Sequence, residues 1–336
     1  MPAVTVLMAV HNAAPFLKEA IDSILDQTFQ DFEFLVVNDG STDTTDAILS
    51  SYTDPRLRVI RLAENVGLAA ALNVGISESR CDLIARMDGD DVCDPRRLEL
   101  QVVFLRECPD VLLLGTGFFR TDVDGRIFER VQYPTDDAVL QERLLAGSQF
   151  CHPSVMMRTP VVRLLGGYRA LAGGAAQDYD LWLRIAEQGQ IANLPDVLLR
   201  YRIHEGQVSV SKLVRQRQAA QLYKTLALQR RGGGREDIDA AQRASQCDQA
   251  DMVRALRADY LRWALRFAAT GRRGLAMQMV LSAHRLNRWH PGAWMSLCRI
   301  VVAECESSWP VARVHWYAKR VLARLLGRSS RGHGEG

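Results

Sequence analysis

The sequence lacks the features that mark several classes of protein. No two of its seven cysteines are spaced as C-x-x-C, and their odd number argues against a complete set of disulfides. Zinc ligation is therefore not expected, and reduced thiols in a cytosolic protein are the simpler interpretation. No apolar run approaches the roughly 20 residues that span a bilayer, and the first run, Val4 to Val10, has no basic leader. We expect the chain to stay on the cytoplasmic side.

Two common nucleotide-binding motifs are also missing. The chain contains neither the phosphate loop G-x-x-x-x-G-K-[ST] nor the dinucleotide fingerprint G-x-G-x-x-G. Nucleotidyl transfer that depends on a glycine- and lysine-rich phosphate loop is therefore not favoured. If the protein binds a nucleotide diphosphate, a metal ion is expected to hold the phosphates.

Charge divides the chain of 336 residues into two parts, although its net charge is only +3. Residues 1–210 contain 19 Lys and Arg against 30 Asp and Glu, whereas residues 211–336 contain 23 against 9. Hydrophobic residues make up 48% of the chain, as in ordinary globular proteins. This asymmetry predicts one domain over residues 1–210 and a basic domain over residues 211–330 with an acidic partner.

Hydrophobic periodicity in the first 90 residues alternates between strands and helices. The predicted strands cover residues 4–10, 32–38, 57–62 and 83–87, and the predicted helices cover 16–27, 42–51 and 67–77. Such alternation predicts an α/β fold with a mostly parallel central sheet flanked by helices.

The pattern changes farther along the chain. We predict strands at 111–120, 126–132 and 197–204, with helices at 139–146 and 180–188. After residue 210 the pattern is entirely helical, which predicts an all-α C-terminal region. Its expected helices cover residues 211–230, 239–269, 275–287, 292–305 and 310–326.

The sharpest cluster of charged residues is Asp88-Gly89-Asp90-Asp91, directly after a predicted strand. Carboxylates so close together repel one another unless a cation lies between them, and oxygen ligands suit Mg²⁺ or Mn²⁺. A solvated, aspartate-rich turn is the alternative interpretation. An EF-hand is not favoured, because Cys93 stands where its loop requires glycine and Pro95 follows.

Three further residues have both a functional and a structural interpretation. Asp39 follows the second strand and could accept a hydrogen bond from a nucleobase, or simply form the turn. Asp178 stands at a helix start after a glycine pair, as a general base or as a first-turn acid. His204 ends the last strand, where it could reach a metal or a diphosphate, or be a packed histidine.

Five motifs, in order, resemble glycosyltransferase family 2 with its Rossmann-like GT-A fold, over about residues 1–210. They lie at residues 10–12, 38–43, 65–73, 87–91 and 177–182. Two positions depart from the family pattern: the first motif lacks the more usual Pro and Tyr, and Gln177 stands where Glu is common.

The resemblance implies a metal-dependent inverting transferase that uses Mn²⁺ or Mg²⁺. The donor is a nucleoside-diphosphate sugar, with UDP favoured, and the acceptor is a hydroxyl of a glycan or of a lipid-linked precursor, as in bacterial surface polysaccharide synthesis. Asp178 matches the catalytic base, and Asp90, Asp88 and His204 match the metal site. The substrate-binding positions are Val10, Asn12, Asp39, Asn65, Gly67, Asn73, Arg86, Asp88, Gln177 and Trp182.

Alternatives remain for the protein as a whole and for its basic half. The chain could be a non-catalytic sugar-nucleotide-binding or scaffold protein that acts through its helices. The predicted helix 310–326 has an apolar stripe beside arginines, which suits either an anionic membrane surface or packing on its own domain. No nucleic-acid recognition motif is present, so no nucleic acid is expected as a partner. A peripheral position on the inner face of the cell membrane is compatible with these patterns.

Overall fold

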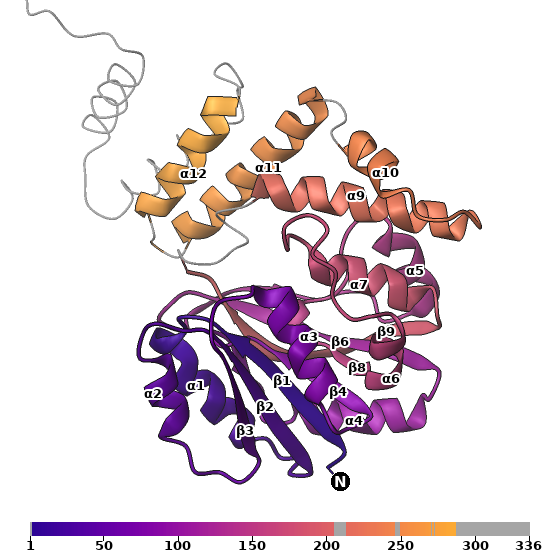
Figure 1. Ribbon diagram of the computed structural model, residues 1–336. Coiled ribbons are helices and arrows are strands. Elements are labelled where there is room, and N and C mark those ends of the chain that lie inside the picture. The colour runs from indigo at the N-terminus through magenta and orange to yellow at the C-terminus, as the bar shows by residue number, and fades with distance from the viewer. Residues whose placement is uncertain (1, 205–212, 246–248, 270, 272, 287–336) are drawn as a thin grey trace, which may run out of the picture. The chain divides into compact units, whose positions relative to one another are not determined.

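The computed structural model describes residues 2–204, 213–245, 249–269, 271 and 273–286 (Figure 1). The chain forms two compact units, Met1–Cys247 and Asp248–Gly336. The sequence-based division was placed near residue 210, which lies inside the first of these units. The predicted helices at 292–305 and 310–326 lie outside the described residues.

The N-terminal half of the first unit is built from parallel strands joined by helices. Its elements are β1 (Val4–Val10), α1 (Ala14–Leu25), β2 (Phe32–Asp39), α2 (Thr45–Ser50), β3 (Leu57–Leu62), α3 (Leu68–Glu78) and β4 (Leu83–Met87). Strand β1 pairs in parallel with β2 and β4, and β2 pairs with β3. Every residue of β1, β2 and β4 is buried, as expected for strands covered on both faces. The predicted β-α-β pattern is confirmed.

The helix α2 begins three residues later than predicted. Asn12 Oδ1 accepts hydrogen bonds from the backbone amides of Thr42 (2.8 Å) and Asp43 (3.3 Å), and Asp43 Oδ1 accepts one from Thr45 N at 2.9 Å. These side chains bind amides that a longer helix would leave to solvent, so the segment forms a turn first.

The sheet becomes mixed in its second half. The further elements are β5 (Val92–Cys93), α4 (Arg97–Glu107), β6 (Val111–Thr121), β7 (Ile127–Val131), α5 (Asp137–Leu144), a 3-10 turn (His152–Ser154), β8 (Met156–Arg158), α6 (Thr159–Leu164), α7 (Gln177–Ala186) and β9 (Gln190–Arg202). The strand order is β3-β2-β1-β4-β8-β6-β9-β5, with β7 on β6. Strand β9 starts seven residues before the prediction, because Gln190 to Asn193 pair with β6. Helix α7 starts at Gln177, so that Asp178 lies in its first turn.

Alternate residues of the strands build two cores, one on each face of the sheet. Val6 and Met8 point to the face covered by α1, α2 and α4, whereas Leu7 and Ala9 point to the face covered by α3, α5, α6 and α7 (Figure 1). The parallel pairing of β1 with β2 and β4 brings the ends of these three strands together. Among the described cysteines, residues 81, 93, 108 and 151 are all free thiols.

Two helices after residue 210 extend the core of the first unit. Helix α9 (Leu213–Arg231) packs against α7, and α10 (Ile238–Ser245) packs against α9. Leu222, Tyr223 and Leu226 of α9 are buried in the same core as Trp182 of α7. The helix that carries Asp178 is therefore covered by a part of the chain that the sequence assigned to another domain.

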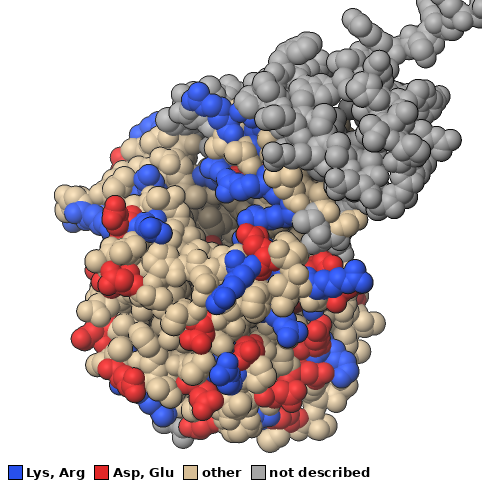
Figure 2. All heavy atoms as spheres, turned by 180° about the vertical axis from the view of Figure 1, so that it is seen from behind, with Lys and Arg blue, Asp and Glu red and all other residues tan. Residues whose placement is uncertain are grey.

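The second unit contains α11 (Gln249–Ala269) and α12 (Arg273–Leu286), which pack against each other. The sequence predicted one helix over 239–269, but the structure has α10 and α11 there as separate helices, which belong to different compact units. Within α11, the rings of Trp263 and Phe267 stack with centroids 5.8 Å apart. On the face of the molecule in Figure 2, acidic and basic side chains are interspersed over the described residues.

Candidate active site

The predicted polar segments meet at the carboxyl edge of the parallel strands. Val10 of β1 lies beside Asn38 of β2, and Met8 lies beside Met87 of β4. Asp39 ends β2, and Asp88 follows β4 directly. Sheets of this kind bind ligands at this edge. The order of the strands thus brings Val10, Asp39 and Asp88 to the same edge.

Asp88, Asp90 and Asp91 form one cluster, with a carboxylate oxygen of each within 4.8 Å of the others. Burial and the neighbouring carboxylates raise the pKa of Asp88 above its usual range and that of Asp91 well above it. The Oδ2 atom of Asp91 is buried without a hydrogen-bond partner. An acidic cluster with an unsatisfied oxygen suits a hard divalent cation, so these residues fit the expected Mn²⁺ or Mg²⁺.

The last predicted metal residue reaches this cluster. His204 Nε2 lies 2.8 Å from Asp90 Oδ2, and the two side chains are 21% and 29% exposed. The imidazole also lies against Phe16 of α1, with ring centroids 5.2 Å apart. Both Asp90 and His204 therefore keep enough exposure to meet a ligand while their positions are set by contacts.

Arg202 holds the acidic loop in place, and sequence reasoning did not identify it. Its backbone amide donates to Asp91 Oδ1 and its Nε to the carbonyl of Asp90, both at 2.9 Å. Its guanidinium lies 4.7 Å from the centre of the Phe16 ring and donates to Glu19. The only signal in the sequence was its place two residues before His204, because the partners of its side chain lie 79 to 183 residues away.

Arg86 is a buried counterion at the base of the cluster. Its side chain is 1% exposed and donates to Asp88 Oδ1 at 2.5 Å, whereas Asp88 is 27% exposed. Arg97, also missed from the sequence, is completely buried and donates to the carbonyls of Arg86 (2.6 Å) and Pro153 (2.8 Å). These contacts fix the end of β4, from which the acidic loop departs.

Asp39 is buried and fastens the loop that precedes α3. Its Oδ1 accepts from Val66 N at 2.8 Å and its Oδ2 from Gly67 N at 3.0 Å. Each carboxylate oxygen has a second lone pair, so a nucleobase N–H can still be bound. Gly67 has φ +89°, a conformation that favours glycine, and Asn65 is exposed nearby.

Asn12 has a structural task in this region. It is one of only two described non-glycine residues with positive φ, at +51°, and its side-chain oxygen caps the turn at residues 42 and 43. Its amide nitrogen lies 3.2 Å from His11 Nε2. The predicted substrate contact by Asn12 stays a prediction, and the turn that it forms shapes the site.

Asp178 comes from a different part of the chain, in the first turn of α7. Ala176, which precedes that helix, has φ +49°, a conformation that costs an L-residue about 1–2 kcal/mol. Burial raises the pKa of Asp178, and the charge of Asp88 raises it further. Since Asp88 acts on Asp178, the predicted base and the acidic cluster belong to one electrostatic environment.

Two predicted substrate-binding residues, Trp182 and Asn73, have structural partners within the protein. Trp182 is 0% exposed and packs on His152 with ring centroids 5.8 Å apart, so a direct substrate contact does not fit its position. Asn73 binds the backbone of Tyr168 twice, accepting from its N–H at 2.8 Å and donating to its carbonyl at 2.9 Å. The sequence could not distinguish these roles, because they depend on neighbours about 30 and 95 residues away.

His152 and Tyr168 form a hydrogen-bonded pair between these supports. His152 Nε2 lies 2.9 Å from the Tyr168 hydroxyl. Burial and the nearby Arg86 lower the pKa of His152 well below its usual value, so the imidazole is neutral. Val10 and Gln177 are each 4% exposed, and Gln177 Oε1 is buried without a hydrogen-bond partner. A substrate contact by either residue stays a prediction.

Comparison with known proteins identifies the family. The sequence profile described as Glycosyl transferase family 2 matches residues 5–163. The putative glycosyltransferase EpsE of Bacillus subtilis is 37% identical over 206 residues, which is 60% of this chain and 73% of that protein. The chain belongs to glycosyltransferase family 2 and is a glycosyltransferase. The O-antigen biosynthesis glycosyltransferase WbnJ of Escherichia coli is 34% identical over 62% of this chain and 83% of its own length.

Solved structures confirm the GT-A-like fold of this family member. S. aureus TarS in complex with UDP matches with a TM-score of 0.56 at 15% identity, covering 99% of this chain and 94% of that one. The mannosyltransferase PcManGT of Pyrobaculum calidifontis, in complex with GDP-Man and Mn²⁺, matches with a TM-score of 0.54 at 18% identity over 97% and 87%. Among the described helices, none is long and apolar enough to cross a membrane.

Proposed function

We propose that this glycosyltransferase moves a sugar from a nucleoside-diphosphate donor, with UDP favoured, to a hydroxyl of a glycan or lipid-linked acceptor in bacterial surface polysaccharide synthesis. The observation that carries the proposal is the separation of two acidic groups within one site. Asp88 and Asp90 follow β4 and lie beside His204, whereas Asp178 comes from α7, where the charge of Asp88 raises its pKa. Asp88 and Asp90 can bind a cation, and Asp178 can accept a proton.

Relatives support the substrate class. WbnJ acts in O-antigen biosynthesis, and the 31%-identical AmsE of Erwinia amylovora is described as an amylovoran biosynthesis glycosyltransferase. TarS has been solved with UDP-GlcNAc, and PcManGT with GDP-Man and Mn²⁺. These proteins favour a nucleotide-sugar donor and a polysaccharide acceptor for this chain as well.

Each acidic residue has a separate task in the proposed reaction. Asp90, Asp88 and His204 would hold Mn²⁺ or Mg²⁺, which when bound neutralises charge on the leaving diphosphate. Arg86 keeps Asp88 in place, and Asp39 offers its remaining lone pairs to the nucleobase. Asp178 removes the proton from the acceptor hydroxyl, whose oxygen forms the new bond to the anomeric carbon as the bond to the diphosphate breaks. Attack from the face opposite the leaving group inverts the configuration.

The test measures nucleoside diphosphate release from a panel of UDP- and GDP-sugars with Mn²⁺, with and without a chelator. We expect release from at least one donor, its loss with chelator, and its loss in Asp178→Asn with unchanged donor binding. Glu142→Gln, at an exposed position of α5, is the matched control. Binding of a donor without turnover would instead favour a non-catalytic sugar-nucleotide-binding protein. If no donor is bound and none is turned over, the proposal is refuted.

We also propose that the enzyme works at the inner face of the cell membrane, where a lipid-linked acceptor lies. Residues 211–336 carry 23 Lys and Arg against 9 Asp and Glu, and Arg254 and Arg262 are exposed on α11. Basic residues near an anionic surface contribute about 1 kcal/mol each. Flotation with phosphatidylglycerol vesicles should recover the protein at low salt and lose it at high salt, whereas phosphatidylcholine vesicles should not bind it.

A further inference from the structure

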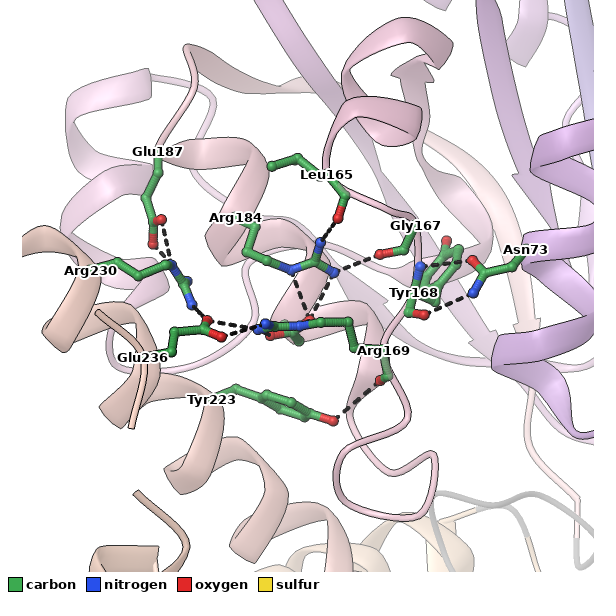
Figure 3. Close-up of polar contacts among 11 residues, drawn as sticks. Asn73, Leu165, Gly167, Tyr168, Arg169, Arg184, Glu187, Tyr223, Arg230 and Glu236 are labelled. Atoms are coloured by element: carbon green, nitrogen blue, oxygen red, sulfur yellow. Dashed lines mark hydrogen bonds and ion pairs between the residues drawn. The ribbon is translucent and has the colours of Figure 1, made fainter. Parts of the chain in front are cut away.

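A network of charged side chains joins the helix of Asp178 to the helical extension of the first unit (Figure 3). Its centre is Arg169, whose guanidinium donates to both oxygens of Asp180 on α7. The same guanidinium donates to Glu236, with an Nη1–Oε2 distance of 2.7 Å. Glu236 lies between α9 and α10, so Arg169 connects that hairpin to a residue two positions after the base.

A second connection ties the other end of α7 to the same hairpin. Arg230 of α9 donates to both oxygens of Glu187, at 2.6 and 2.8 Å, directly after the last residue of α7. Arg230 also donates to Glu236. Glu236 therefore accepts from two arginines, and through them it contacts the beginning and the end of the base-bearing helix.

The network also reaches the loop that leads into α7. Arg184 donates to Asp180, at 2.9 Å, and to the carbonyls of Leu165 and Gly167, both at 2.7 Å. The Tyr223 hydroxyl of α9 donates to the carbonyl of Arg169 at 3.4 Å. This loop ends at Ala176, whose left-handed conformation persists only when its surroundings hold it.

Charge balance makes Glu236 the essential partner from the hairpin. Asp180 is 1% exposed and is bound by both Arg169 and Arg184, so this pairing alone leaves one positive charge uncompensated. Arg230 adds a second, and Glu236 with Glu187 supplies the two matching negative charges. Partly buried charges require such compensation, so the removal of Glu236 forces Arg169 and Arg230 to move apart or to recruit water.

The ionisation of the group agrees with this arrangement. Although burial opposes the shift, the hydrogen bonds from Arg169 and Arg230 lower the pKa of Glu236. Burial alone would lower the pKa of Arg169, but its hydrogen bonds to Asp180 and Glu236 outweigh this effect and raise that pKa. Both shifts favour the charged forms of Glu236 and Arg169, as their hydrogen-bonded pairing requires.

We infer that Glu236 and Arg230 are positioning residues, through which the α9–α10 hairpin fixes the place of Asp178 by way of Arg169 and Asp180. The catalytic part of this inference rests on the proposed function, whereas the effect on the loop does not. Residues of the hairpin lie beyond the segment 5–163 that matches the family profile. The extension thus supports the helix that carries Asp178, which itself lies beyond residue 163.

The test uses the full-length chain with Glu236→Gln, which keeps the shape and removes the charge. Hydrogen–deuterium exchange should become faster in peptides covering residues 166–182 and stay unchanged in peptides covering α1. Glu236→Asp should restore slow exchange in part, because it keeps the charge. Glu142→Gln, which removes an exposed carboxylate elsewhere, should leave exchange at residues 166–182 unchanged.

Activity gives a second, independent readout with the donor that the wild type hydrolyses. Displacement of a reacting group by ~1 Å can cost on the order of 100-fold in rate, so we expect a fall in kcat of about 10-fold or more in Glu236→Gln with an unchanged donor Kd. Leu49→Ala in α2, matched to Glu236→Gln in melting temperature, should keep kcat.

The outcomes separate the inference from the proposed function. Unchanged exchange at residues 166–182 in Glu236→Gln would overturn the inference. The same holds if the kcat of Glu236→Gln is no lower than that of the Leu49→Ala control. If no donor is turned over by the wild type, the proposed function fails, but the exchange measurement still decides whether the hairpin holds the loop.

Discussion

His204 Nε2 lies 2.8 Å from Asp90 Oδ2, although the two residues are 114 positions apart in the chain. His204 follows β9 by two residues, and Arg202, the last residue of that strand, holds the backbone of the acidic loop. The end of β9 and the residues after it thus supply contacts to the aspartates that follow β4.

The acidic cluster should bind a divalent cation and gain stability from it. A ligand that binds only the folded state at 100 times its Kd stabilises it by about 2.7 kcal/mol. Added Mn²⁺ should therefore raise the melting temperature of the wild type, and Asp90→Asn should lose most of that rise. Asp124→Asn, in an exposed turn, is the control and should respond as the wild type does. Equal shifts in all three proteins would place the cation elsewhere.

The pH dependence of turnover should report Asp178. A base acts in its deprotonated form, and burial and Asp88 raise its pKa above 3.8. Activity is therefore expected to fall as the pH drops through this raised pKa, at a higher pH than an exposed aspartate would give. In Asp178→Asn, kcat should fall by about 10²–10⁴-fold. A profile that stays flat down to the pH at which the protein unfolds would argue against this assignment.

Arg202→Lys should weaken both the fold and the cation site. Lysine keeps a positive charge but cannot donate to Asp90, Val123 and Glu19 at once as the guanidinium does. We expect a loss of about 1–3 kcal/mol in the free energy of unfolding and a lower Mn²⁺ affinity in calorimetry. Arg61→Lys, on the exposed edge strand β3, should change neither quantity much. Unaltered Mn²⁺ affinity in Arg202→Lys would show that the loop does not need this support.

Trp182→Phe separates a packing role from a substrate-binding role. The indole is completely buried and its Nε1 has no hydrogen-bond partner, so phenylalanine removes volume without breaking a hydrogen bond. Denaturant unfolding should show a loss of about 1–3 kcal/mol, while the KM for the donor stays unchanged. A raised KM at wild-type stability would mean that Trp182 contacts the substrate after all.

Local patterns predicted the features that depend on neighbours in sequence. Alternating strands and helices up to Met87 were read from hydrophobic spacing, because parallel β-α-β units repeat that spacing. Asp88, Asp90 and Asp91 lie within four residues, so their mutual repulsion follows from covalent proximity. Element ends were predicted less well, since they depend on side chains such as Asn12 that bind distant backbone amides.

The sequence by itself determined the family, the α/β class and the identity of the acidic residues at the strand ends. Only the tertiary structure decided which predicted residues face the site: it buries Trp182 in the core and engages Asn73 with Tyr168. It also revealed Arg202 and the pair of Arg169 with Glu236, which lie 67 residues apart. Such partners have no fixed spacing, because these contacts arise where segments distant in the sequence pack together and not from any local pattern.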